Sequence, residues 1–202
     1  MKPPRVIAVS KKQPTEKIRS LHNLGLKCFA ENYLQEALLK KSQLVDLDIS
    51  WHFIGQIQSK KIKDLVGNFD LIHSVTRISE LEKMSLVAGE KNIQQDFLVQ
   101  INIADEETKQ GVKTNELQNF VDEAQKFLHL RLSGLMVFPP LCQTGEESLQ
   151  WFAKGQAFFQ EHQKRIGPSF KHLSMGTSGD FHLAYRKGAT DLRIGESLLG
   201  SR

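Results

Sequence analysis

A lysine near the start of the chain has a position that could make its amine reactive. Lys11 comes directly after Val6–Ser10, an apolar run typical of a buried strand. An amine that is partly removed from water loses some preference for its charged form, which helps it attack an aldehyde. An ordinary solvated lysine at the end of a strand would look the same, so both interpretations of Lys11 stay open.

Two turns rich in glycine and hydroxyl side chains lie near the C-terminus. They are Ser174–Asp180 and Arg193–Glu196, and each precedes a segment that could begin a helix. Backbone N–H groups in such turns, with the positive end of a helix, can hold a phosphate dianion. We therefore expect a phosphate site here, with two plain tight turns as the alternative.

Further candidate residues end two earlier strands. Asn32 could contact a ligand ring, or it could cap the helix that follows. His52 alternates onto the opposite strand face from its aromatic neighbours, where a histidine is more often a hydrogen-bonded core group than a base. The seven histidines lack the spacing of metal ligands, so we expect no metal.

These residues belong to a chain in which short apolar runs alternate with longer amphipathic stretches. Such alternation predicts an α/β fold, and eight strands favour a (β/α)8 barrel, whose functional groups lie at the C-terminal strand ends. The alternative is an open doubly wound sheet, against which no G-x-G-x-x-G follows an early strand. The expected strands are Arg5–Ser10, Cys28–Glu31, Ser50–Ile54, Leu71–Ser74, Phe97–Ile103, Leu130–Val137, Lys171–Ser174 and Asp191–Ile194. The expected helices are Pro14–Leu24, Tyr33–Ser42, Lys60–Val66, Ile78–Ala88, Asn115–Leu128, Glu146–Arg165 and Gly179–Lys187.

Composition favours one globular domain, residues 1–202. The chain is 40% hydrophobic and 25% charged, which are ordinary values for a protein with a sizeable core. The net charge of +4 comes from scattered lysines without interleaved aromatic residues, so we expect no nucleic acid as a partner. We also expect no membrane segment or signal peptide. Cys28 and Cys142 form no C-x-x-C pair, which favours a reduced, cytoplasmic protein.

A lysine after the first strand, combined with a phosphate site after the last two, indicates a ligand that carries both an aldehyde and a phosphate. In these residues the chain resembles the pyridoxal-phosphate homeostasis protein family, also called YggS-like or PROSC-like. The matching stretches occur in the family's order and are Ala8–Lys11, Glu31–Glu36, Trp51–Gly55, Gln58–Ser59, His73–Val75, Gln100–Ile103, Gly134–Met136, Leu173–Gly176, Ser178–Asp180 and Arg193–Gly195.

The resemblance implies a TIM-type barrel like that of alanine racemase, a fold-type III pyridoxal 5′-phosphate (PLP) protein. It implies that PLP is held as a Schiff base on Lys11, that Arg193 faces the pyridine nitrogen, and that the phosphate lies near Ser178, Gly179 and Gly195. The full set of expected cofactor-binding residues is Lys11, Asn32, His52, Ser174, Met175, Ser178, Gly179, Arg193 and Gly195.

Family members are regarded as carriers or regulators of PLP without an established reaction, so we expect a non-catalytic protein with no catalytic residues. We expect a monomer, with apo PLP-dependent enzymes as candidate recipients. A PLP-dependent amino-acid racemase, a Schiff-base aldolase and a non-enzymatic binding module are the alternatives. An arginine against the ring nitrogen disfavours the racemase, because it keeps that nitrogen unprotonated and the ring a poorer electron sink.

Four features depart from the family pattern. Ala30 replaces a usual glycine, Lys60 a usual asparagine, and Glu196 a frequent small hydroxyl residue whose replacement would repel phosphate unless it faces solvent. The usual N-terminal helix before the first strand is lacking. We expect the outer faces of Val6–Val9 and Leu192–Ile194 to lack one covering helix, with partial cover from Ser197–Leu199 and marginal stability.

Overall fold

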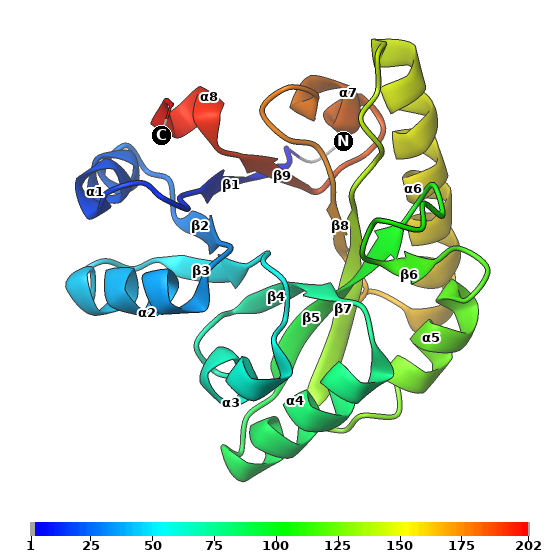
Figure 1. The fold of residues 1–202 in the computed structure, drawn as a ribbon, viewed down its shortest axis with the longest axis horizontal. Coiled ribbons are helices and arrows are strands. Elements are labelled where there is room, and N and C mark those ends of the chain that lie inside the picture. Colours follow the sequence, from blue (N-terminus) through cyan, green and yellow to red (C-terminus); the bar gives the residue numbers. More distant parts are fainter. Residues whose placement is uncertain (1–2, 202) are drawn as a thin grey trace.

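The structure, a computed structural model, describes residues 3–201 and confirms the alternation of strands and helices. Figure 1 shows the helices on the outside and the strands between them. The strands are β1 (Arg5–Val9), β2 (Cys28–Glu31), β3 (Ser50–Phe53), β4 (Leu71–Val75), β5 (Gln95–Asn102), β6 (Val112–Lys113), β7 (Leu130–Val137), β8 (His172–Ser174) and β9 (Asp191–Ile194). The helices are α1 (Thr15–Asn23), α2 (Leu34–Gln43), the 3-10 turn η1 (Ser59–Lys61), α3 (Ile62–Leu65), α4 (Ile78–Glu90), α5 (Leu117–Ala124), α6 (Gly145–Ile166), α7 (Phe181–Arg186) and α8 (Glu196–Leu199).

The strands close into a parallel barrel. Neighbours follow the order β4, β3, β2, β1, β9, β8, β7, β5, and β4 also pairs with β5, which completes the ring. The two-residue strand β6 lies outside this ring, against the end of β5. The expected (β/α)8 barrel is therefore confirmed, and the open-sheet alternative is wrong because both edges of an open sheet would remain unpaired.

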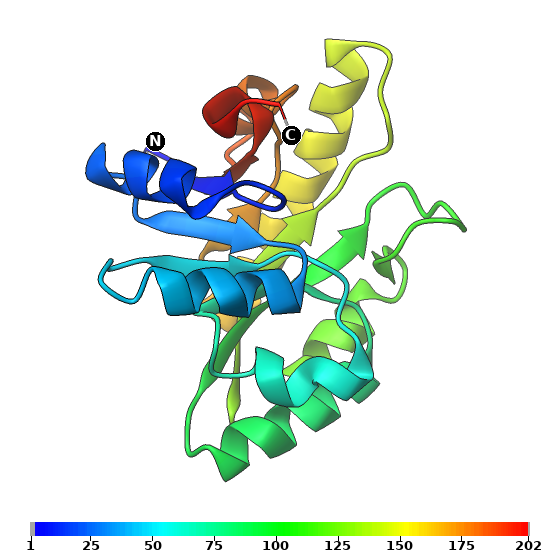
Figure 2. The same ribbon diagram turned by 60° about the vertical axis from the view of Figure 1, so that its left-hand side comes forward.

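Alternation along the strands sends one set of side chains outward, against the helices, and the other set into the barrel. On β9, Leu192 joins the large hydrophobic cluster that fills the layer between barrel and helices, whereas Arg193 points to the interior. The same layer contains Phe29 and Phe97, both fully buried. Figure 2 shows α1 and α2 stacked side by side over the first strands, in the position that covers this layer. The barrel interior contains the polar side chains described below together with several apolar ones, among them Ile7, Leu71 and Met136.

The outer faces of β1 and β9 are better covered than the sequence suggests. Leu192 and Ile194 are 4% and 6% exposed, and Leu199 of α8 is 4% exposed where α8 contacts β1. Side chains of the first helix region hold this C-terminal helix: Lys17 Nζ donates to Leu199 O over 2.6 Å, and Gln13 Nε2 donates to Gly200 O over 3.1 Å. The expected partial cover by the C-terminal segment is therefore confirmed: Leu192 and Ile194 are buried, whereas Val6 and Val9 on β1 are half-buried.

Some boundaries differ from those expected. The helix expected at Asn115–Leu128 is limited to α5, because Lys126 N donates to Glu123 O in a tight turn and Leu128 is 86% exposed. The helix after β4 runs on to Glu90, and β6 was not expected.

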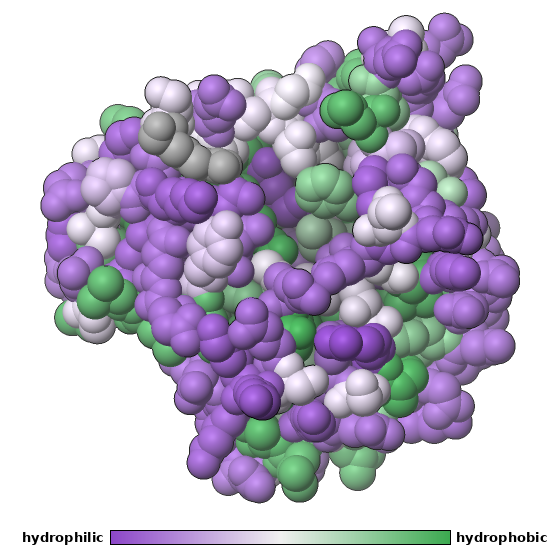
Figure 3. Space-filling view, viewed as in Figure 1, coloured by the Kyte–Doolittle hydropathy of each residue, from purple (hydrophilic) through white to green (hydrophobic). Residues whose placement is uncertain are grey.

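No helix within residues 3–201 is both long and apolar enough to cross a membrane. Hydrophilic residues cover most of the face seen in Figure 3.

Candidate functional site

Lys11 lies in a tight turn just beyond β1, at the C-terminal end of the strands. Ser10 N donates to Ala30 O over 3.0 Å, which continues the β1–β2 ladder, and Gln13 N then donates to Ser10 O over 3.0 Å to close the turn. Lys12 within the turn has φ of 59°, in the left-handed region that residues with a Cβ seldom adopt. Lys11 itself is half-buried. The turn therefore presents Lys11 at the barrel mouth, as expected.

The β1–β9 pairing brings the second glycine-rich turn alongside this lysine turn. Ala8 pairs with Ile194, so the next residues, Val9 and Gly195, leave the barrel side by side. A Cβ added to Gly195 would lie 3.5 Å from Val9 O, an ordinary contact distance. The Lys11 turn and the second glycine-rich turn thus share one corner of the mouth, although Lys11 and Gly195 are 184 positions apart in the sequence (195 − 11).

The two glycine-rich turns converge on the hydroxyl of Ser178. Its Oγ accepts hydrogen bonds from Gly195 N at 3.1 Å and from Ser197 N at 3.4 Å, and Ser197 Oγ contacts Ser178 O at 3.5 Å. A Cβ added to Gly179 would meet nothing within 4 Å, so space lies in front of that residue. Glu196 is exposed to solvent, so its carboxylate need not repel an anion bound at this turn. Hydroxyl groups, the turn amides that hold them and open space together form a candidate anion site.

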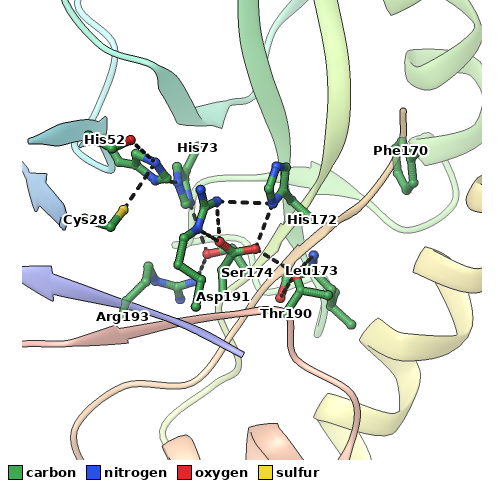
Figure 4. Close-up of polar contacts among 12 residues, drawn as sticks. Cys28, His52, His73, Phe170, His172, Leu173, Ser174, Thr190, Asp191 and Arg193 are labelled. Carbon is green, nitrogen blue, oxygen red and sulfur yellow. Dashed lines mark hydrogen bonds and ion pairs between the residues drawn. The ribbon is translucent and has the colours of Figure 1, made fainter. Parts of the chain in front are cut away.

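A chain of hydrogen bonds runs through the barrel interior beneath this corner (Figure 4). Arg193 Nη1 donates to Ser174 Oγ at 2.8 Å, and this hydroxyl lies 3.0 Å from His73 Nδ1. His73 Nε2 lies 2.9 Å from His52 Nδ1, and His52 Nε2 lies 3.3 Å from Cys28 Sγ. Four strands contribute to the chain besides β9, so the barrel fixes the guanidinium from behind.

Burial sets the charges along this chain. Removal from water lowers the pKa of His52 to about 3 and that of His73 well below its ordinary value, so both rings are neutral near pH 7. Burial also lowers the pKa of Arg193 to about 10, which still leaves the guanidinium charged. A neutral imidazole has one donor and one acceptor nitrogen, so the hydrogen bonds of both rings must run in a common direction. The result is one buried cation held by neutral groups.

The guanidinium of Arg193 has further contacts that fix its plane. Nη2 donates to Val137 O at 3.1 Å, and the central carbon lies 5.4 Å from the ring centre of Phe138. His73 and Phe138 were not among the expected site residues. His73 is part of a sequence stretch that matches the family, but its role depends on strand register. The register brings its ring next to Ser174, 101 positions later in the chain.

The remaining expected residues lie at different depths. Asn32 is half-buried at the mouth, and its Oδ1 has no hydrogen-bond partner among the described residues. It does not cap α2, whose N-cap position is Tyr33, so the capping alternative is wrong. Met175 is fully buried in the large hydrophobic cluster, and its N–H already donates to Asp191 O. Ser174 and His52 are buried inside the barrel, where both belong to the hydrogen-bond chain that ends at Arg193.

A separate ionic group closes the opposite end of the barrel. Asp191, fully buried, accepts hydrogen bonds from Arg5 Nε at 2.6 Å and Thr190 Oγ1 at 2.6 Å, and lies 3.0 Å from His172 Nδ1. Burial alone would raise the pKa of Asp191, but these partners outweigh it and hold the pKa below the ordinary range. These contacts link β1 and β8 to β9 at this end of the barrel. Residues 3–201 contain no cluster of three or more metal-ligating side chains.

Comparison with known sequences places the whole chain in one family. The profile of the alanine racemase N-terminal domain matches residues 1–202. A protein of Aquifex aeolicus named pyridoxal phosphate homeostasis protein is 39% identical over 198 residues, covering 98% of this chain and 87% of its own. One of the same name from Pseudomonas aeruginosa is 36% identical, covering 98% and 84%.

Solved structures give the same result. PipY of Synechococcus elongatus, described as having PLP bound, superimposes with a TM-score of 0.89 at 34% identity and covers 98% of this chain and 92% of its own. The PLP-free form of PipY has a TM-score of 0.91 at 35% identity, covering 98% and 93%. An alanine racemase of Clostridium difficile matches at a TM-score of 0.80 but only 14% identity, with 56% of its own chain covered, and shows the fold alone.

Proposed function

The chain belongs to the family of pyridoxal phosphate homeostasis proteins, built on the alanine racemase N-terminal domain, and we propose that it binds PLP as a Schiff base on Lys11. In this proposal the protein carries or buffers PLP in the cell and does not turn over a substrate. The observation that supports it best is the shared corner of Lys11 and the Ser178–Gly195 anion site, which offers an amine beside a place for a phosphate.

The chemistry of the site fits this cofactor. PLP, when bound, supplies an aldehyde for amines and a ring that withdraws electrons. The phosphate would accept from the Ser178 hydroxyl, whose oxygen the amides of Gly195 and Ser197 hold in place, near the open space at Gly179. The buried, unpartnered Oδ1 of Asn32 supports a further polar contact with the ligand at the mouth.

Each of the proposed cofactor-binding residues then has a specific role. The Lys11 amine condenses with the aldehyde, forming a C=N bond and releasing one water molecule. Arg193 faces the ring nitrogen. Ser174 holds Arg193 directly, and His52 acts through His73 and Ser174. Met175 contributes through the position of its backbone, because its side chain is in the core.

The charge on Arg193 supports a carrier rather than an enzyme. A pKa of about 10 keeps the guanidinium protonated near pH 7. A permanent cation at the ring nitrogen opposes protonation of that nitrogen, and the ring then stabilises a carbanion poorly. We accordingly propose a cytoplasmic monomer that supplies apo PLP-dependent enzymes and has no nucleic-acid or membrane partner.

Titration with PLP tests this function. The purified wild-type protein should develop the visible absorption of a protonated Schiff base and bind PLP one to one. Lys11→Ala should lose this absorption yet retain weak binding through the phosphate site. Chiral analysis after incubation with single L-amino acids should show no D-isomer. A wild-type protein without visible absorption, or one that racemises an amino acid, would contradict the proposal.

A further inference from the structure

Behind the Lys11 turn lies a buried ionic cluster that the proposed function does not use. It consists of Glu31 at the end of β2 and of Glu36 and Lys40 on α2, and it contacts the turn at Ser10 and Lys12. Glu31 is fully buried and Lys40 is 5% exposed, while the Glu36 side chain is 26% exposed. Removing such ions from water costs free energy, which their mutual attraction only partly offsets.

Lys40 is the centre of the cluster. Its Nζ donates to Glu31 Oε1 at 2.7 Å, to Glu36 Oε1 at 2.6 Å and to the backbone carbonyl of Ser10 at 2.6 Å. These three bonds use all three ammonium protons. The Ser10 hydroxyl adds a fourth link, donating to Glu31 Oε1 at 2.7 Å. The carbonyl just before Lys11 is thereby attached to both β2 and α2.

The residue just after Lys11 is held in the same way. Lys12 N donates to Glu36 Oε1 at 2.5 Å, the same oxygen that accepts from Lys40. Lys12 has φ of 59°, a conformation that is unfavourable for a residue with a Cβ and persists only when surrounding contacts hold it. Lys11 therefore lies between two backbone groups that are fixed by one charged cluster.

The cluster is poorly explained by stability alone. Glu31 Oε2 is buried with no hydrogen-bond partner within residues 3–201, and burial raises the pKa of this carboxyl against the opposing effect of Lys40. A buried ion pair is often no more stabilising than apolar side chains of the same size. Apolar side chains, however, could not accept from Lys12 N–H or donate to Ser10 C=O.

We propose that Lys40 and Glu36 are positioning residues, which fix the Ser10–Gln13 turn so that the Lys11 amine meets a carbonyl carbon held at the neighbouring anion site. The inference rests on the proposed Schiff base and concerns the rate and yield of its formation, not the binding of the phosphate. A misplacement of about 1 Å can slow such a step by up to about a hundredfold.

Glu36→Ala is the main test, because Glu36 is partly exposed and the variant should fold. It removes the acceptor of Lys12 N–H, whereas Glu36→Gln keeps an acceptor oxygen at the same place. Glu123→Ala serves as the control, since the exposed side chain of Glu123 on α5 forms an ion pair with Lys126, just beyond that helix. Lys40→Met combined with Glu31→Gln is a second variant that removes the centre of the cluster without leaving a buried charge unpaired.

Two probes separate positioning from general damage. Stopped-flow absorbance gives the rate of Schiff-base formation with PLP. Binding of 4′-deoxypyridoxine 5′-phosphate, which has a methyl group in place of the aldehyde, reports the anion site alone. We expect Glu36→Ala and the double variant to slow formation by about tenfold or more and to leave analogue affinity within about twofold. Glu36→Gln and Glu123→Ala should behave as wild type.

The outcomes are distinguishable. Equal loss of analogue binding and Schiff-base formation in Glu36→Ala would show a merely structural role and overturn the inference, as would an unchanged rate. A wild-type protein that binds the analogue but forms no Schiff base with PLP would refute the proposed function, and this inference with it.

Discussion

The two buried histidines make the stability of this barrel depend on pH in a way that can be worked out. His52 and His73 are neutral in the folded protein because burial lowers the pKa of each. In the unfolded chain the same imidazoles titrate near 6.5. Below that pH the unfolded state binds protons that the folded state does not, so stability falls as pH falls. For His52 the fall continues until its folded pKa of about 3.

The magnitude follows from the pKa difference. Each pH unit below 6.5 costs about 1.4 kcal/mol for each histidine that stays neutral. At pH 5 the loss is about 2 kcal/mol for His52, and the lowered pKa of His73 adds to it in the same direction. Typical domains have a free energy of unfolding of about 5–15 kcal/mol, so mild acid should remove a large share of the stability.

Urea denaturation between pH 7 and pH 4.5, followed by tryptophan fluorescence, measures this dependence. His52→Gln removes one of the two groups and leaves every other titrating residue in place. Its free energy of unfolding should be lower at pH 7 but should fall less steeply on acidification, by about 1.4 kcal/mol per pH unit. Parallel slopes for the wild type and His52→Gln would refute the argument that His52 is buried and neutral.

Three other substitutions test the site and the fold. Arg193→Glu places a carboxylate where a protonated ring nitrogen could pair with it, so PLP should bind more weakly but react faster, seen as slow transamination with added amino acids; equal rates would contradict the placement of Arg193. Ser178→Ala removes the hydroxyl that would donate to the phosphate and that two turn amides hold in place, so it should weaken PLP binding about tenfold, with unchanged affinity as the contrary result. Gly134→Ala would bring a Cβ to 1.9 Å from His172 O at φ of 152°, so it should lower the free energy of unfolding by about 3 kcal/mol or more, measured by urea denaturation; a stable variant would show that β7 and β8 can separate there.

Much of the site was predictable because its residues follow strands. Lys11 comes after an apolar run, and the turns at Ser178 and Gly195 contain the glycines and hydroxyls that a phosphate site needs. A parallel barrel brings the ends of its first and last strands together, so these turns had to meet. Local sequence and general topology were enough to infer this much.

The interior was not predictable in the same way. The contact between His73 and Ser174 joins β4 to β8, and it depends on register and on which side chains point inward. Lys40 looked like an ordinary helix lysine, since nothing in the sequence places it against Glu31 in a buried cluster. The apolar spacing continues to Leu128 and therefore predicted a longer helix than α5. The fold instead ends α5 at Ala124 and leaves Leu128 exposed. These features arise from packing between distant segments.

Borohydride reduction tests the central claim most directly. The wild-type protein loaded with PLP would be reduced, digested and analysed by mass spectrometry for the lysine that carries the pyridoxyl group. The account predicts one modified residue, Lys11, and loss of the modification in Lys11→Ala. Reduction of the native protein that places the pyridoxyl group on another lysine, or leaves none bound, would contradict it.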